Sequence, residues 1–234
     1  MLYVIGDVHG EREVNKLNSD RTEHIGKDDT VVILGDFGLL WCNPPTKSEL
    51  WWLKWLVNRP FQVCFIDGNH ENFDLLDNLK TEEFAGGLAG VAFEMDGKKI
   101  YHLKRGEIYT IDDVTFLTIG GALSIDKGFR KEGVSWWSRE ILDYSEMSHA
   151  VDNLEKHNNT VDCILTHTGP RTILDVMGFS SRGDIDPVSA DLEFILNTAK
   201  FKKWFFGHMH IDDNYGDKFY AVYDNILKCG SSDV

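Results

Sequence analysis

The chain has 234 residues, of which 42% are apolar and 26% charged, so it is long enough to bury a large hydrophobic core. Its formal net charge of −14 argues against a dedicated nucleic-acid-binding protein, because such proteins neutralise phosphates with Lys and Arg. A phosphate-containing substrate is compatible with this charge, since bound cations would reverse the local field. We expect one domain over residues 1–234.

The apolar runs are shorter than the roughly 20 residues that span a bilayer, so we expect no membrane partner. A strand predicted from Leu2 leads directly into candidate ligands, so we also expect no cleaved leader. The four cysteines lack CxxC spacing, and Cys64 and Cys163 fall within apolar strands, which is typical of buried free thiols. These features predict a cytoplasmic protein with reduced cysteines.

The first third of the chain alternates strands with helices. Strands are predicted at residues 2–6, 30–35 and 61–66, and helices at 11–19, 47–58 and about 72–79. Thr46 and Glu49 have the spacing of a capping box at the start of the second helix. This alternation predicts parallel strands joined by crossover helices, and such sheets bind ligands at the carboxyl ends of their strands.

The middle of the chain is rich in β-forming residues. Hairpins predicted at 91–103 and 108–119 would form a second sheet that packs on the first. The elements expected after them are a loop at 121–138, a helix at 139–157, strands at 161–166 and 203–206, a loop at 178–186, a helix capped by Asp186, and tail strands at 218–223 and 226–229. The sequence therefore predicts an α/β fold with two sheets.

Five of the predicted strands end in side chains that bind divalent metals. These side chains belong to Asp7, His9, Asp36, Asn69, His70, His167, His208 and His210. Any one of them has an ordinary explanation, such as a helix cap or a surface histidine. Together at one sheet edge they would be costly without a compensating cation. Imidazole and oxygen ligands without thiolates favour Mn, Fe, Zn, Co or Ni.

A glycine precedes a candidate ligand in four of these places. They are Gly6, Gly35, Gly68 and Gly207. Glycine permits a sharp turn and a close approach of backbone to a crowded site. An ordinary strand-ending glycine would explain any one of the four, but it explains the repeated pattern poorly.

The ordered motifs Gly6-Asp7-Val8-His9-Gly10, Gly35-Asp36, Gly68-Asn69-His70-Glu71, His167 and Gly207-His208-Met209-His210 resemble the calcineurin-like metallophosphoesterase superfamily over residues 3 to 210. Residues 120–127, with Arg130 and the Trp136-Trp137 pair, are similar to its small bacterial and phage-type members. The resemblance implies a two-sheet β-sandwich flanked by helices, in four α/β/β/α layers.

The resemblance also implies a role for each matching residue. Asp7, His9 and His210 would hold one divalent ion, Asn69, His167 and His208 would hold a second, and Asp36 would bridge both. Family members place a hydroxide between ions that lie roughly 3.5–4 Å apart. His70 would protonate the leaving oxygen or stabilise the phosphoryl group. Mn is the first choice of metal.

The sequence departs from the Ser/Thr protein phosphatases at Leu39 and Leu40, where those enzymes hold an aspartate and an arginine. We therefore predict a metal-dependent phosphoesterase acting on a phosphate monoester or diester, in a small molecule, a nucleotide or a protein. A Ser/Thr-type protein phosphatase and a non-catalytic partner-binding member of the fold are the alternatives. A nuclease fits the acidic chain poorly, because no extended nucleic-acid surface is expected.

Candidate substrate contacts are Lys127, Arg130 and Arg171, which lie in loops near predicted strand ends. Solvated surface charge explains each of them equally well. Trp136 and Trp137 would either line a pocket or pack as core.

Overall fold

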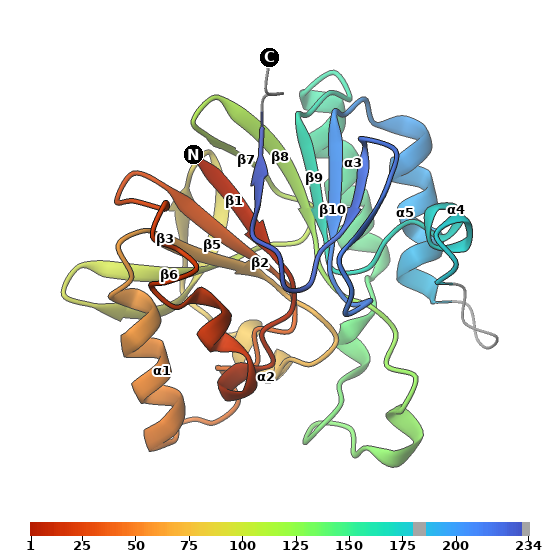
Figure 1. Cartoon of the computed structure of the whole chain (residues 1–234). Coiled ribbons are helices and arrows are strands. Elements are labelled where there is room, and N and C mark those ends of the chain that lie inside the picture. The colour runs from red at the N-terminus through yellow and green to blue at the C-terminus, as the bar shows by residue number, and fades with distance from the viewer. Residues whose placement is uncertain (180–185, 231–234) are drawn as a thin grey trace.

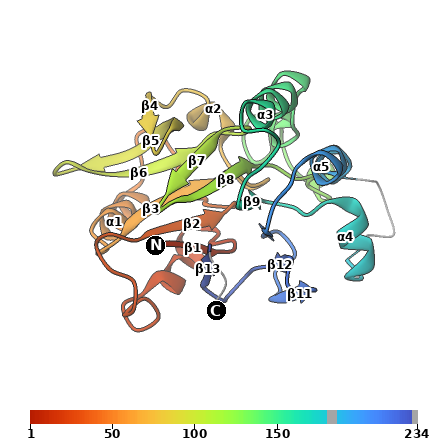
Figure 2. The same ribbon diagram turned by 90° about the horizontal axis from the view of Figure 1, so that it is seen from above.

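Residues 1–179 and 186–230 are described by the computed structural model. Two mixed β-sheets pack face to face, with α1 on the outer side of one sheet and α3 and α5 on the outer side of the other (Figures 1 and 2). The four predicted α/β/β/α layers are confirmed. Residues 180–185 of the loop predicted at 178–186 lie outside the described residues.

The first sheet has the strand order β13-β1-β2-β3-β6-β5-β4. Its strands are β1 (Leu2–Ile5), β2 (Thr30–Leu34), β3 (Gln62–Ile66), β4 (Thr81–Phe84), β5 (Gly87–Met95), β6 (Lys98–Leu103) and β13 (Leu227–Cys229). The strands β1, β2, β3 and β6 are parallel neighbours, as their crossover connections require.

The second sheet has the order β11-β12-β10-β9-β8-β7. Its strands are β7 (Ile108–Ile111), β8 (Val114–Ile119), β9 (Cys163–Thr166), β10 (Lys203–Phe206), β11 (Asp213–Tyr215) and β12 (Phe219–Ala221). Of the two hairpins that the sequence predicted, only β7–β8 belongs to this second sheet. The hairpin β5–β6 extends the first sheet, because Val63 of β3 pairs with Ile100 of β6. Its predicted place in the second sheet is therefore wrong.

The helices are α1 (Lys47–Val57), α2 (Phe73–Leu76), α3 (Tyr144–Lys156), α4 (Arg171–Val176) and α5 (Pro187–Thr198). The capping box is confirmed, since Thr46 and Glu49 each accept the other's backbone N–H through the side chain. Asp143 and Glu146 form a second capping box, which starts α3 later than the predicted residue 139. Among the described residues, no helix is both long and apolar enough to cross a membrane.

The helix predicted at 11–19 is instead two 3₁₀ turns, Gly10–Arg12 and Val14–Leu17. Glu13 separates them with a φ of −131° and a ψ of −1°, which no α-helix accommodates. The break leaves Glu13 and Lys16 side by side, 2.6 Å apart as an ion pair. Both side chains then support the functional site described below.

Three apolar layers hold the two sheets and their helices together. The middle layer, between the sheets, includes Val4, Val32, Ile66, Leu165 and Phe205. The layer beneath α1 includes Ile5, Ile33 and Leu53, and the layer beneath α3 and α5 includes Ile164, Leu154, Leu192 and Trp204. The sheets therefore share a continuous core, which keeps their strand ends in fixed positions.

Candidate metal centre

The carboxyl ends of five strands meet at one end of the two sheets. In the first sheet Ile5 aligns with Ile33, and Leu34 aligns with Ile66. In the second sheet Thr166 aligns with Phe206. The strand pattern in the sequence predicted that all the candidate ligands lie along one sheet edge. The structure instead divides them between the two sheets, and they face each other across the sandwich.

One group of candidate ligands consists of Asp7, His9, Asp36 and His210, whose potential ligand atoms all lie within 4.8 Å of one another. Asp7 Oδ2 is 2.9 Å from His210 Nε2, and Asp36 Oδ2 is 3.2 Å from His9 Nε2. Both carboxylate oxygens are buried, yet neither has a partner with hydrogen-bond geometry. Leaving such oxygens unpaired would be costly, so this donor set fits a metal ion.

A second group surrounds His167, which is fully buried. Its Nδ1 donates a hydrogen bond to the Leu34 carbonyl at 2.7 Å, because a carbonyl can only accept. Burial lowers the pKa of His167, but the carboxylates of Asp36 and Asp7 outweigh burial and raise that pKa. Its Nε2 lies 3.0 Å from Asn69 Oδ1 and 3.5 Å from Asp36 Oδ1, so a positive charge at Nε2 is favoured. A metal ion among these atoms would take the place of the Nε2 proton, because imidazole binds metals in its neutral form. The second group therefore also fits a metal ion.

His208 packs against His167 with ring centroids 5.0 Å apart. Burial, reinforced by His167, lowers the pKa of His208 to about 4. The ring is therefore neutral near pH 7, and neutral imidazole is the form that binds metals.

Asp36 belongs to both groups, because its two carboxylate oxygens face different neighbours. Oδ2 lies beside His9, whereas Oδ1 lies toward His167 and accepts the backbone N–H of His70 at 2.8 Å. Burial alone would raise the pKa of Asp36, but His167 and His9 outweigh it and hold that pKa well below its usual value. The carboxylate is therefore ionised and available on both sides.

The backbone is strained where these side chains converge. Positive φ angles occur at His9 (43°), Asp36 (48°), His208 (64°) and His210 (53°). Non-glycine residues rarely adopt this left-handed conformation, and it costs of order 1–3 kcal/mol at each position. Such strain persists only where surrounding contacts enforce it, and it concentrates at functional sites.

Two of the glycines that precede ligands are required by close packing between motifs. A Cβ atom on Gly35, whose φ is +99°, would lie 2.1 Å from His167 Nδ1. A Cβ atom on Gly68 would lie 2.1 Å from Asp36 Oδ1. Each glycine therefore makes room for a ligand that belongs to another motif.

The Asp7 side of the site is supported by a group of residues that the sequence did not predict. Lys16 Nζ donates to the Asp7 carbonyl at 3.0 Å and pairs with Glu13. The Tyr223 hydroxyl donates to Glu13 at 2.7 Å, and the Tyr223 ring stacks on His210 with centroids 4.9 Å apart and planes 14° apart. Tyr223 follows the last motif in the chain, so no local pattern pointed to it.

The carboxylate of Glu71 supports the turn after Asp36. It is almost fully buried and accepts the backbone N–H groups of Phe37 at 2.6 Å and Gly38 at 3.2 Å. Burial, together with the charge of Asp36, raises the pKa of Glu71 well above its usual value. The Gly-Asn-His-Glu motif contained this residue, but its spacing did not reveal what the carboxylate binds.

A buried ion pair supports the Asn69 turn from below. Arg105 donates to Asp67 Oδ2 through Nε at 2.9 Å and Nη2 at 2.6 Å, and it also reaches Glu146 at 2.9 Å. His102 lies 3.1 Å from the other oxygen of Asp67. The strand before Asn69 is thereby fixed to β6 and to the start of α3.

Of the three predicted substrate contacts, the structure brings only Arg130 to the site. Arg130 Nη1 lies 2.7 Å from His70 Nδ1. Lys127 is exposed, and its Nζ lies 5.9 Å from the centre of the Trp136 ring. Arg171 lies on α4, where its guanidinium is 3.8 Å from Asp175. Neither contact is with a candidate metal ligand.

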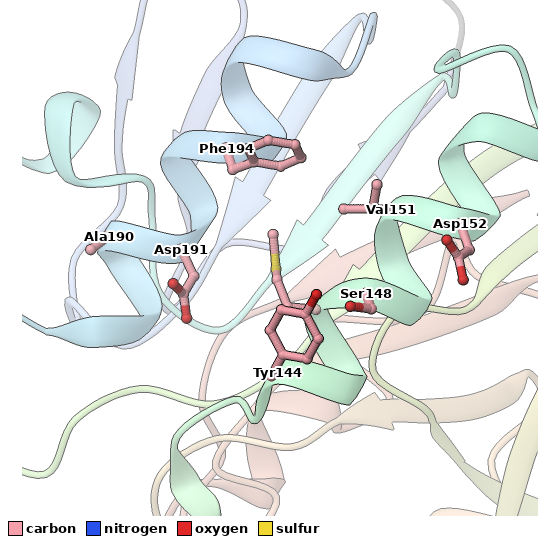
Figure 3. Close-up of a pocket in the computed structure, with 8 residues that line it drawn as sticks. Tyr144, Ser148, Val151, Asp152, Ala190, Asp191 and Phe194 are labelled. Carbon is pink, nitrogen blue, oxygen red and sulfur yellow. The ribbon is translucent and has the colours of Figure 1, made fainter.

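A cavity of about 490 Å³ lies between α3 and α5, on the outer face of the second sheet. Figure 3 shows Tyr144, Val151 and Phe194 around it, with Asp152 and Asp191 at its rim. None of the candidate metal ligands lines this cavity. The reactive groups therefore gather at the strand ends and not in the cavity.

The chain is similar to a phosphopantetheinyl hydrolase from Mycobacterium tuberculosis, with 17% identity, a TM-score of 0.47, and coverage of 95% of this chain and 89% of that chain. A Staphylococcus aureus structure, provisionally named as a 5′-nucleotidase, gives 16% identity, a TM-score of 0.46, and coverage of 95% and 48%. The chain thus spans about half the length of the second protein.

Comparison with curated proteins finds no match. The family model of the calcineurin-like phosphoesterases matches residues 1–212, which include all the candidate ligands. The chain therefore belongs to the calcineurin-like phosphoesterase family.

Proposed function

We propose that this protein hydrolyses a phosphate monoester or diester with the help of two divalent metal ions. The proposal rests chiefly on the buried Oδ2 atoms of Asp7 and Asp36. Each oxygen lies beside an imidazole nitrogen, yet neither oxygen has a partner with hydrogen-bond geometry. One ion would be held by Asp7, His9 and His210, the other by Asn69, His167 and His208, and both by Asp36. Two ions supply acidification of a water nucleophile and neutralisation of the phosphoryl oxygens when they are bound.

The mixed imidazole and oxygen donors support Mn as the first choice, with Fe, Zn, Co and Ni also compatible. Asn69 contributes a neutral oxygen, which limits the negative charge of the site and suits an anionic substrate. The described cysteines Cys42, Cys64, Cys163 and Cys229 are all free. Reduced thiols are consistent with the cytoplasmic location that the sequence predicts.

His70 is proposed to act directly on the substrate. Arg130 can only donate hydrogen bonds, so its Nη1, 2.7 Å from Nδ1 of His70, favours the neutral tautomer with the ring proton on Nε2, to which Arg130 Nη2 makes only a longer approach of 3.5 Å. Burial, reinforced by Arg130, lowers the pKa of His70 against the opposing effect of Asp36. These observations favour a neutral Nε2–H donor that stabilises the phosphoryl group over an imidazolium that protonates the leaving oxygen.

Arg130 is the proposed substrate contact on the same loop. Its guanidinium also pairs with Asp126 at 2.6 Å and donates to the Ser135 carbonyl at 3.2 Å. Arg130 is nevertheless partly exposed beside His70. An arginine in this place can bind phosphoryl oxygens through parallel N–H groups. Lys127 lies on the same loop and is the second candidate.

The protein phosphatase alternative receives no support from the turn after Asp36. Leu39 is fully buried in the core beneath α1, and Leu40 packs against the same core. The positions that carry an aspartate and an arginine in protein phosphatases are thus part of the hydrophobic core here. We propose that substrate recognition comes instead from the Arg130 loop, which contacts His70.

The proposal is tested by assaying the purified protein with Mn²⁺ on p-nitrophenyl phosphate, bis(p-nitrophenyl) phosphate and a set of nucleotides. Hydrolysis of the first substrate alone would identify a monoesterase, and preference for the second would identify a diesterase. Absence of hydrolysis in every case, from a folded protein that binds Mn²⁺, would instead support the non-catalytic, partner-binding alternative.

A further inference from the structure

The side-chain amide of Asn69 has one orientation that suits a metal ion. Its Oδ1 lies 3.0 Å from His167 Nε2, inside the second group of ligands. Its Nδ2 points away and donates to Ser124 Oγ at 3.0 Å. A flipped amide would present N–H donors to the metal position, and an N–H group cannot bind a cation. Whatever fixes this amide therefore determines whether Asn69 can serve as a ligand.

Ser124 can fix the amide because its own hydrogen is already used. Its hydroxyl donates to Glu140 Oε2 at 2.7 Å, and its backbone N–H donates to Glu140 Oε1 at 2.8 Å. The lone pairs of Ser124 Oγ are then free to accept the Asn69 N–H. The carboxylate thus sets the direction of the whole chain of hydrogen bonds from Glu140 to Asn69.

These three side chains are enclosed by the fold. The exposed fractions are 5% for Asn69, 2% for Ser124 and 0% for Glu140. Bulk water therefore has little access to take the place of any of these hydrogen-bond partners. Glu140 lies in the 3₁₀ turn Ser138–Glu140, whose Arg139 carbonyl accepts from Arg105 Nη2 at 2.9 Å. The acceptor at the end of the hydrogen-bond chain is therefore anchored independently of Asn69.

We propose that Ser124 and Glu140 are positioning residues that keep the oxygen of Asn69 directed toward the second metal position. This inference rests on the proposed two-metal function. It assigns a purpose to two buried polar residues that lie outside the metal-binding motifs. Their effect passes through Asn69, so it concerns the second ion and not the ion near Asp7 and His9.

The first test is a Mn²⁺ titration of the purified full-length protein, monitored by competition with a chromogenic chelator. Ser124→Ala should retain one ion with unchanged affinity and bind the second about 10–100-fold more weakly. Glu140→Gln keeps the size of the side chain and should weaken the second ion in the same way. Thr22→Val is the control, because it also removes a buried hydroxyl, which donates to the Asn18 carbonyl at 2.8 Å.

A double-mutant cycle separates positioning from a general structural effect. If Ser124 acts through Asn69, then Ser124→Ala should cause no further loss of Mn²⁺ affinity in the Asn69→Ala background. Ser124→Thr, which keeps a hydroxyl, should restore the affinity for the second ion. If Ser124→Ala does not fold, the comparison of Glu140→Gln with the same Asn69→Ala background decides the question.

The possible outcomes distinguish this inference from the proposed function. If the wild-type protein binds two Mn²⁺ ions, and Ser124→Ala and Glu140→Gln bind both with the same affinities, only this inference is overturned. The inference is also overturned if Ser124→Ala lowers Mn²⁺ affinity equally in the wild-type and Asn69→Ala backgrounds, because the effect would then be structural. A folded wild-type protein that binds no Mn²⁺ would overturn both.

Discussion

Nη1 of Arg130 lies 2.7 Å from Nδ1 of His70, so this histidine has a cation as its hydrogen-bond partner. A carboxylate at this place would favour a protonated imidazole, whereas a guanidinium disfavours one. Asp126 holds the guanidinium from its other side at 2.6 Å. Under the proposed function, the loop that carries Arg130 would therefore set the orientation of the His70 ring toward a substrate.

Arg130→Ala should lower kcat by about 10–100-fold while both metal ions remain bound, because His70 loses the partner that orients its ring. Arg130→Lys should lose less, since the charge remains but the planar fork does not. Arg171→Ala is the matched control, because Arg171 pairs with Asp175 on α4. Steady-state kinetics with metal analysis checks this, and an equal loss in both alanine variants would contradict the assigned role.

His70→Ala should retain the metal ions and reduce turnover by roughly 10²–10³-fold, the range expected for loss of one hydrogen-bond donor that stabilises the reacting group. His70→Asn keeps an N–H donor of similar reach, so it should retain more activity than the alanine variant. The measurement is kcat at saturating Mn²⁺. Undiminished turnover in His70→Ala would show that this side chain has no part in the reaction.

The sequence predicted that the candidate ligands lie close together because each follows an apolar strand, where local pattern and sheet geometry agree. It could not divide the strands between two sheets, because an antiparallel hairpin such as β5–β6 can extend either one. The pairing of Val63 with Ile100 is a tertiary contact, and no periodicity within either strand encodes it.

The supporting residues were harder to predict than the ligands, for a physical reason. Ser124 contacts Asn69, which lies 55 positions earlier in the chain. Tyr223 contacts His210, and 223 − 210 gives a separation of 13 positions. The sequence predicted one helix over residues 11–19, but the chain breaks at Glu13. The buried position of Lys16 therefore did not follow from the predicted helix. Folding alone brings these side chains to the site, so their spacing carries no motif.

Tyr223→Ala should weaken Mn²⁺ binding at the position formed by Asp7, His9 and His210 by roughly tenfold, because the ring that stacks on His210 is lost. Tyr223→Phe keeps the ring and removes only the hydrogen bond to Glu13, so its affinity should stay closer to that of the wild type. Mn²⁺ titration compares the two variants. If phenylalanine and alanine weaken binding equally, stacking is not what supports His210.

Treatment with EDTA should abolish hydrolysis of p-nitrophenyl phosphate or its bis ester, whichever the protein accepts, and added Mn²⁺ should restore it. The reason is that the described site brings imidazoles and carboxylates together, and metal ions are needed to activate water among them. Activity assays before and after dialysis check this. Activity that survives complete removal of metal would show that the reaction uses other groups.

The central claim is that Asp36 serves both metal positions, since its two oxygens face His9 and His167 separately. The most direct test is elemental analysis of the wild-type protein and of Asp36→Asn, with Asp7→Asn and His167→Ala as single-position controls. We predict about two ions per wild-type chain, loss at both positions in Asp36→Asn, and loss mainly at one position in each control. Two tightly bound ions and normal turnover in Asp36→Asn would contradict the account.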